Sequence, residues 1–339
     1  MDPVEALRRI AFLLERRREE TYRVKAYRSA ADTLAALPPG EAAERAQAGT
    51  LTELKGVGPK TAQVAAEAAA GRVPAYLVEL EAAADGPVTT GGAELRALLR
   101  GDLHTHSDWS DGGSPIDEMA RAARDLGHDY VVLTDHSPRL TVANGLSPAR
   151  LRKQLDIVAQ LNEELAPFRL LTGIEVDILD DGTLDQEDEL LARLDVVVAS
   201  VHSKLKMPAE DMTRRMVNAV ANPHTDVLGH CTGRLVTGGR GTRGESQFDA
   251  EVVFEACRQF GVAVEINSRP ERLDPPRRLL RLAVETGCVF SVDTDAHAPG
   301  QLDWQPYGCE RAEECEVPYD RVVNTKPVDD LLVWTARHT

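Results

Sequence analysis

The chain has 339 residues, a hydrophobic content of 42% and a formal net charge of −16. Its length allows one to three domains with sizeable cores, and its acidity argues against a general nucleic-acid binder, because such proteins usually meet phosphates with a basic surface. The sequence has no apolar run of the roughly 18 residues that a membrane span requires, and charged residues interrupt any signal-peptide pattern near the N-terminus. We therefore expect a cytoplasmic protein without a membrane partner.

The first 84 residues predict an all-helical domain. Ala, Leu, Glu and Arg dominate this stretch, and apolar residues such as Leu7, Ile10, Leu13 and Leu14 recur at helical spacing. The stretch holds 12 Lys/Arg and 12 Asp/Glu, whereas the rest of the chain holds 27 and 43. The acidic excess therefore lies entirely outside this domain, and the net charge of the whole chain does not exclude DNA as a partner.

A glycine turn followed by a helix start is the second feature of this domain. In the run from Leu51 to Ala62, Gly56 and Gly58 flank a valine, and Lys60 follows them. Free backbone amides at a helix N-terminus can bind a phosphate, and the lysine adds a positive charge. The run resembles a helix-hairpin-helix, which grips the DNA backbone without reading sequence, so Gly56, Gly58 and Lys60 are the predicted DNA contacts. A plain turn between two packed helices would carry the same G-x-G pattern.

Residues 85–92 interrupt the helical pattern with the sequence Asp-Gly-Pro-Val-Thr-Thr-Gly-Gly. A Pro/Gly-rich run of this kind is typical of a linker, and a short helix is expected after it at residues 93–100. We therefore predict a helical domain over residues 1–84, a linker over residues 85–100 and a second domain over residues 101–339.

Strand-like and helix-like segments alternate throughout the second domain. The strand-like ones are continuous apolar runs, such as Val196-Val197-Val198-Ala199, which is the pattern of a parallel sheet covered by helices. Strands are expected near residues 102–106, 130–135, 169–175, 195–201, 226–230, 262–267 and 288–293. Helices are expected, among other places, at residues 115–126, 147–165, 249–260 and 276–286. The alternation predicts an α/β fold in which seven strands form a TIM-like barrel.

Histidines and carboxylates stand at or just beyond most of these strand ends. The C-termini of parallel barrel strands converge on one rim, so ligands scattered along the sequence would meet in one site. His104 and His106 are two residues apart and project from the same face of a strand, which lets both imidazoles chelate one ion. Asp295 and His297 repeat this spacing, and the carboxylate of Glu175 can bridge two ions. The full candidate set is His104, His106, Asp111, His136, Glu175, His202, His230, Asp295 and His297.

The order H-x-H, T-D-H, G-x-E, S-x-H, G-H and D-A-H, over residues 102 to about 335, resembles the PHP family (polymerase and histidinol phosphatase). The resemblance implies a distorted seven-stranded β/α barrel (the PHP fold), hydrolysis of phosphoesters and as many as three divalent metal ions. It assigns His104, His106, Glu175 and Asp295 to one ion, Glu175, His202 and His230 to a second, and Asp111, His136 and His297 to a third. Imidazole with carboxylate suits zinc, manganese or iron better than calcium or a lone magnesium.

Three further residues are predicted to take part in catalysis. Asp135 precedes His136 and can orient a ligand from outside the metal's own ligand set, although a carboxylate at a strand end can equally be structural. Arg234 and Arg269 lie in loops beyond predicted strands and can hold the phosphate of a substrate. Surface arginines without such a role are also common.

The N-terminal domain carries a second resemblance. The run from Tyr22 to Ala30, followed by the hairpin, is similar to the N-terminal lyase-type domain of bacterial family X DNA polymerases, and residues 323–327 are also similar to theirs. Those proteins carry a PHP domain at the other end and use it as a 3′–5′ exonuclease and repair phosphoesterase. In them a palm and fingers region separates the two ends, and residues 85–101 here leave no room for it. The resemblance therefore implies a DNA 3′–5′ exonuclease or 3′-end-processing enzyme without polymerase activity.

Two other functions fit the same sequence. A small-molecule phosphatase acting on histidinol phosphate or a nucleotide would use the same metal site, and the acidity of residues 85–339 favours it. A non-catalytic DNA-binding protein would use the metal only for stability, but a structural site tolerates lost ligands and none is lost here. We therefore expect DNA 3′ ends as the partner, with a small phosphorylated metabolite as the alternative.

Overall fold

The computed structural model describes residues 1–84, 86–238 and 241–336 of the chain. It divides into two compact units, Met1–Pro87 and Val88–Thr339. The division falls inside the stretch predicted as a linker, and the helix α6 (Ala93–Leu98) belongs to the second unit. In the described part of the chain, no helix is both long enough and apolar enough to cross a membrane.

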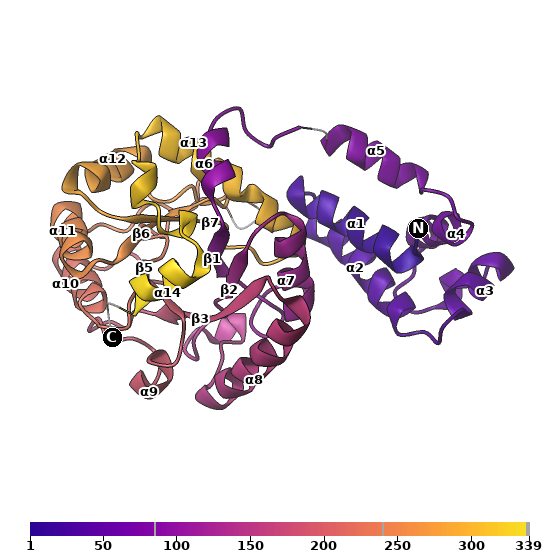
Figure 1. Ribbon diagram of the computed structural model, residues 1–339, viewed down its shortest axis with the longest axis horizontal. Helices are drawn as coiled ribbons and strands as arrows, with labels where there is room; N and C mark the ends of the chain where they lie inside the picture. The colour runs from indigo at the N-terminus through magenta and orange to yellow at the C-terminus, as the bar shows by residue number, and fades with distance from the viewer. Residues whose placement is uncertain (85, 239–240, 337–339) are drawn as a thin grey trace. The chain divides into compact units, whose positions relative to one another are not determined.

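The first unit is built of helices alone, as predicted (Figure 1). They are α1 (Pro3–Arg16), α2 (Thr21–Ala35), α3 (Glu41–Ala48), α4 (Pro59–Ala69) and α5 (Ala75–Ala84), with the short 3-10 helix η1 (Leu51–Glu53). Asp2 begins α1, because its side chain accepts hydrogen bonds from two first-turn amides. The apolar stripe of α1, with Leu7, Ile10 and Leu14, is fully buried and forms part of the unit's own core. This separate core follows from the helical spacing of the apolar residues.

Glu15 of α1, which is buried, and Arg28 of α2, which is partly buried, form an ion pair inside this unit. Arg28 Nε and Nη2 donate to the two carboxylate oxygens at 2.9 and 2.8 Å. We expect Arg28→Ala to lower the free energy of unfolding by about 3 kcal/mol, because the buried carboxylate of Glu15 then loses two charged hydrogen bonds. Urea unfolding followed by circular dichroism measures the change. Arg45→Ala is the control, because the ion pair of Arg45 with Glu41 is partly exposed. This substitution should lower the free energy of unfolding by less than about 1 kcal/mol. Equal effects of the two substitutions would contradict the expectation.

Seven parallel strands form the centre of the second unit, and each pairs with its neighbours in chain order. They are β1 (Gly101–Thr105), β2 (Tyr130–Leu133), β3 (Arg169–Asp177), β4 (Val196–Ser200), β5 (Val227–Leu228), β6 (Ala263–Asn267) and β7 (Phe290–Asp293). The long β3 pairs with β2 through its first residues and with β4 through its last five. A bridge between Thr105 and Ala296 connects the end of β1 to the segment after β7. The strands thus form a nearly closed barrel, which confirms the predicted α/β fold.

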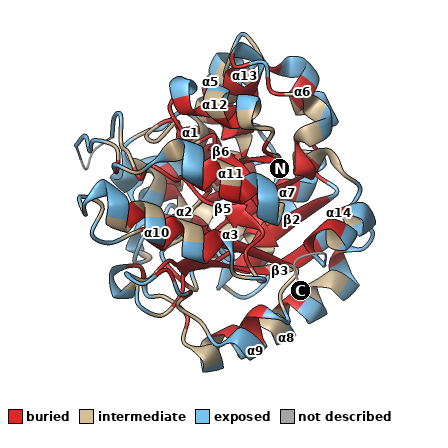
Figure 2. Cartoon of the chain, turned by 90° about the vertical axis from the view of Figure 1, so that its left-hand side faces the viewer, coloured by how far each residue is buried: buried red, intermediate tan, exposed pale blue. Residues whose placement is uncertain are grey.

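The strands of the barrel are buried on both faces, toward the barrel interior and toward the surrounding helices. Every residue of β4, for example, is buried, and Figure 2 shows the strands enclosed by helices whose outer surfaces are exposed. This is the burial expected when side chains fill the barrel and helices cover its outside. The covering helices are α7 (Ile116–Asp125), α8 (Pro148–Leu165), α9 (Asp188–Leu191), α10 (Ala209–Val220), α11 (Ala250–Phe260), α12 (Arg277–Thr286), α13 (Gln305–Glu314) and α14 (Val328–Thr335).

Asn324 ties the first strand to the last. Its side-chain amide donates to the carbonyls of Gly101 in β1 and Val292 in β7 at 3.0 and 2.8 Å, and its oxygen accepts from Val292 N–H at 3.1 Å. The 3-10 helix η5 (Val323–Thr325) that carries Asn324 therefore bridges the seam of the barrel.

The end of the predicted linker is attached to the barrel unit. The amides of Thr90 and Gly91 donate to Glu310 Oε1 of α13 at 3.2 and 3.1 Å. Gly92 has a φ of +76°, and a Cβ atom there would lie 2.3 Å from the Glu310 backbone nitrogen. Only glycine allows this close approach. Residues 90–98 are therefore part of the second unit.

Candidate metal centre

The structure brings all nine predicted ligands together at the C-terminal ends of the barrel strands. His104 lies in β1 and Glu175 in β3, and the remaining seven follow the ends of β1, β2, β4, β5 and β7. Six of the nine are buried, namely His104, His106, His136, Glu175, His230 and Asp295. Among the described residues, three groups have ligand atoms that all lie within 4.8 Å of one another: His106, Asp111, His136 and His297; His104, His106 and Glu175; and His136, Glu175 and His202.

Glu175 is the centre of the cluster. Its Oε1 lies 2.8 Å from His230 Nε2 and 3.2 Å from His202 Nε2. Its Oε2 lies 2.9 Å from His136 Nδ1 and 3.3 Å from His104 Nε2. Burial by itself would raise the pKa of the Glu175 carboxyl, but His202, His104 and His136 hold that pKa well below its usual range. An ionised carboxylate facing imidazoles with both oxygens is suited to bridge two ions.

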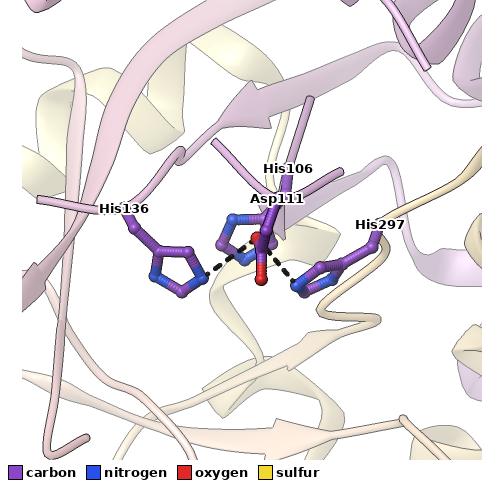
Figure 3. Close-up of side chains that lie close together, drawn as sticks. All are labelled: His106, Asp111, His136 and His297. Carbon is purple, nitrogen blue, oxygen red and sulfur yellow. Dashed lines mark ion pairs between the residues drawn. The ribbon is translucent and has the colours of Figure 1, made fainter. Parts of the chain in front are cut away.

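Asp111 brings a second carboxylate to the opening of the site. Its Oδ1 lies 3.4 Å from His136 Nε2 and 3.3 Å from His297 Nε2, and the ring of His106 lies beside them (Figure 3). Asp111 is also the most exposed of the four, with 30% of its side-chain surface accessible. This group therefore lies where a substrate can reach it.

The donor atoms fit metal ions rather than a hydrogen-bonded core. Within the described chain, buried imidazole nitrogens of His104, His106, His136, His202 and His230 have no hydrogen-bond partner, which is rare for buried polar atoms. Many of the nitrogen–oxygen separations are between 3.2 and 3.5 Å. Ligands about 2.0–2.2 Å from a shared ion stand at such separations from one another. The residues present therefore fit bound divalent cations.

Two carboxylates that the sequence analysis did not identify orient the histidines. Glu265 Oε1 lies 2.5 Å from His104 Nδ1, and Asp177 hydrogen-bonds His202 Nδ1. A carboxylate beside Nδ1 favours the tautomer that carries its proton there, which leaves the Nε2 lone pair of the same ring free to bind a metal ion. The sequence does carry a signal for both. Glu265 interrupts the apolar strand Ala-Val-Glu-Ile-Asn, and Asp177 stands two residues after Glu175, on the same face of β3.

Two arginines approach Asp295 from the neighbouring loop. Arg272, which the sequence analysis also missed, donates from Nε to Asp295 Oδ2 at 2.9 Å. The predicted Arg269 donates to the Asp295 carbonyl and contacts His297 Nδ1 at 3.0 Å. Burial would raise the pKa of the Asp295 carboxyl, but these arginines hold it well below its usual range. Asp295 also has a φ of +53°, a strained conformation of the kind that concentrates at functional sites.

The other two predicted catalytic residues, Asp135 and Arg234, form hydrogen bonds with groups of the protein itself. Asp135 accepts hydrogen bonds from Ser107, Ser110 and Gln154 at 2.5–2.8 Å, so it fixes the loop that leads to Asp111 rather than a histidine ring. Arg234 donates to the carbonyls of Arg272 and Leu273 and pairs with Glu245. Arg234, which lies between β5 and α11, thus holds the loop after β6 that carries Arg272. These contacts do not support its predicted contact with a phosphate.

The hairpin lies in the first unit and has the expected turn geometry. Gly56 has a φ of +91°, which residues other than glycine rarely adopt. Gly58 precedes α4, and its N–H donates to Thr61 Oγ1 at 3.0 Å. Lys60 is exposed in the first turn of α4. The hairpin thus presents a helix N-terminus and a lysine to solvent, which are features of a phosphate-binding turn.

Comparison with known proteins identifies both units. Residues 1–72 match the model of a helix-hairpin-helix domain, and residues 102–269 match that of the PHP domain. The chain is 39% identical over 240 residues to the "DNA polymerase/3'-5' exonuclease PolX" of Bacillus subtilis, an alignment that covers 71% of this chain and 41% of that protein. The chain thus spans less than half the length of this relative.

Two further similarities cover about two thirds of the chain. A "Probable phosphatase" of Caldanaerobacter subterraneus is 29% identical over 248 residues, which are 69% of this chain and 90% of that protein. The crystal structure of histidinol phosphate phosphatase from Lactococcus lactis, with zinc, L-histidinol and phosphate, aligns with a TM-score of 0.47 and 18% identity, covering 64% of this chain and 92% of that one.

The family predicted from the order of the ligands is therefore confirmed by the domain matches and by the identity to PolX. The chain belongs to the PHP family of phosphoesterases, which are hydrolases of phosphoester bonds, and carries a helix-hairpin-helix domain before its PHP domain.

Proposed function

We propose that the chain is a metal-dependent phosphodiesterase that removes nucleotides from DNA 3′ ends and has no polymerase activity. The observation that carries this proposal is the cluster around Glu175, in a chain whose first unit is a helix-hairpin-helix domain. A relative that is 39% identical over 240 residues carries a 3′–5′ exonuclease in its name. Only residues 73–101 lie between the two matched domains, so the chain has no polymerase domain between them.

Three divalent ions, of zinc, manganese or iron, are the proposed cofactors. As in the sets expected from the sequence, Asp111, His136 and His297 would hold one ion, His202 and His230 a second, and His104, His106 and Asp295 a third, with Glu175 shared by the last two. His106 lies close to both His104 and Asp111, so it would stand between two of these ions. When bound, divalent ions polarise a phosphate and lower the pKa of a water molecule that attacks phosphorus. Mixed imidazole and carboxylate donors suit these three metals.

Residues around the metal ligands would position the substrate and orient the ligand side chains. Arg269 stands beside His297 with 24% of its side chain exposed, so its remaining N–H groups can hold a phosphate oxygen. Glu265 and Asp177 contact Nδ1 of His104 and His202 and would favour a proton on that nitrogen, which leaves Nε2 for the metal. No protein side chain needs to act as the nucleophile in this arrangement.

A small-molecule phosphatase is the second candidate. The "Probable phosphatase" relative aligns over 90% of its own length with this chain, and the residues beyond the helical unit carry the whole negative charge. A substrate such as histidinol phosphate would then reach the site around Asp111 without any help from the hairpin.

The two candidates are separated by comparing substrates. We expect the intact protein with Mn²⁺ to release nucleotides from a 3′-labelled primer, and the double variant His104→Ala, His106→Ala to lose this activity by about 10³-fold or more, because ligands of a catalytic ion are removed. His224→Ala, a histidine outside the cluster, is the matched control and should keep full activity. Phosphate release from histidinol phosphate with the primer left intact would favour the phosphatase. Hydrolysis of neither substrate, together with binding of DNA, would favour a non-catalytic protein with a structural metal site.

A further inference from the structure

A buried arginine on α10, Arg215, lies between two segments that adjoin the metal site. It is only 1% exposed and is among the largest fully buried side chains of the chain. A buried guanidinium is costly unless its N–H groups find partners. Among the contacts of the described residues, every oxygen atom that accepts from Arg215 belongs to the backbone or to Ser203, and none belongs to a carboxylate. The cation is therefore held by the two segments themselves and not by an ion pair.

The first of these segments follows β3 and the second follows β4. Arg215 Nε donates to the carbonyls of Ile178 and Leu179 at 3.0 and 2.9 Å, and Nη2 also donates to the Ile178 carbonyl. Nη1 donates to the carbonyl of Ser203 at 2.9 Å. The pairing of the two strands ends where the Ile178 amide donates to the Ser200 carbonyl at 2.8 Å. One planar side chain thus continues the connection between the two strands beyond their last shared hydrogen bond.

Each segment adjoins one member of a carboxylate–histidine pair. Ile178 directly follows Asp177, and Ser203 directly follows His202. Asp177 hydrogen-bonds His202 Nδ1, and Nε2 of the same ring lies 3.2 Å from Glu175 Oε1. The hydrogen bonds of Arg215 therefore fix the spacing of the two backbone segments from which this carboxylate and this imidazole project.

We propose that Arg215 is a positioning residue that sets the affinity for the ion assigned to His202 and His230, by keeping Asp177 against the His202 ring. The inference rests on the proposed function, because it takes the cluster around Glu175 to hold metal ions. Arginine suits this role, since its planar fork bonds both segments at once, whereas the compact ammonium of lysine does not reproduce that geometry. Apart from the shared Glu175, the ligands of the other two ions lie outside these segments, so those ions should be affected less.

The test measures the metal content of the full-length protein at graded concentrations of free Mn²⁺, and anomalous X-ray diffraction locates the bound ions. The variants are Arg215→Lys and Asp177→Asn, alone and together, with Arg215→Gln in place of the lysine variant if that protein does not fold. Met216→Ala is the control for stability, because Met216 is fully buried in the hydrophobic core on the same helix. The cavity that it leaves weakens the fold but keeps the arginine in place.

We expect Arg215→Lys to weaken the binding of one ion by about 10- to 100-fold, and the position left vacant at low Mn²⁺ to be the one between His202 and His230. Met216→Ala should bind every ion as the intact protein does. In the Asp177→Asn protein, Arg215→Lys should add little, because both substitutions act through the same contact.

Unchanged affinity in Arg215→Lys, an equal loss of every ion, or effects that add in the double variant would overturn the inference while leaving the metal centre in place. An intact protein that holds one ion or none at saturating Mn²⁺ removes the multinuclear centre of the proposed function, and the inference with it.

Discussion

Glu175→Gln is expected to lower the rate of phosphoester hydrolysis by about 10³-fold, because neutralising this carboxylate removes charge that stabilises ions at the centre of the site. Both oxygens of Glu175 face imidazole nitrogens, with four of them at 2.8–3.3 Å. Glutamine has nearly the same shape, so the substitution tests the charge and the donor atom rather than the packing. The measurement is kcat/KM with saturating Mn²⁺, together with the metal content of the purified variant.

The control for this substitution is Glu164→Gln on α8, where the carboxylate is exposed and pairs only with Arg121 among the contacts described. It should retain the activity and metal content of the intact protein. A Glu175→Gln protein that remains folded by circular dichroism and hydrolyses substrate at more than about a tenth of the normal rate would show that this carboxylate does not bridge catalytic ions.

Glu265→Gln is expected to weaken metal binding by about 10- to 100-fold without removing any ligand. Glu265 lies behind His104, and its other oxygen accepts the His230 backbone amide. The amide side chain of glutamine binds the histidine less strongly and no longer sets the ring nitrogen that carries the proton. The dependence of activity on free Mn²⁺ measures the effect, since the half-saturating concentration should rise and high Mn²⁺ should restore much of the rate.

Glu255→Gln on the exposed side of α11 is the matched control and should leave the metal dependence unchanged. An unchanged half-saturating Mn²⁺ concentration in Glu265→Gln would mean that this carboxylate supports the barrel and not the ligand. Loss of activity that no concentration of Mn²⁺ restores would instead point to a direct role in the reaction.

The sequence predicted the barrel well because its strands are uniform apolar runs with a clear alternation of helices between them. The predicted strand at residues 226–230 is the exception, since β5 contains only Val227 and Leu228. Gly229 follows, and His230 has a φ of +20°. A positive φ is not an extended conformation, so the strand pairing ends before His230. A glycine before a ligand is a weak sequence signal, because glycine occurs in strands as well as at their ends.

The ligands could be predicted because parallel strands bring their ends to one rim whatever the sequence distance between them. Residues that support the ligands were harder to predict, because their roles depend on which side chains meet. Arg272 touches Asp295 across 23 positions, and Glu265 touches His104 across 161. Glu265 stands out as a charged residue in an apolar strand, but no local pattern tells which histidine it contacts. The attachment of residues 90–98 to α13 was missed for the same reason, because its partner, Glu310, lies more than 200 positions away.

The most direct test of the central claim is the metal content of the purified chain. Protein prepared without chelators and equilibrated separately with zinc, manganese or iron would be measured by inductively coupled plasma mass spectrometry after removal of free ions. A centre built from these nine ligands predicts about three tightly held ions per chain with at least one of these metals. One ion or none per chain with every metal, in a folded protein, would contradict the multinuclear site.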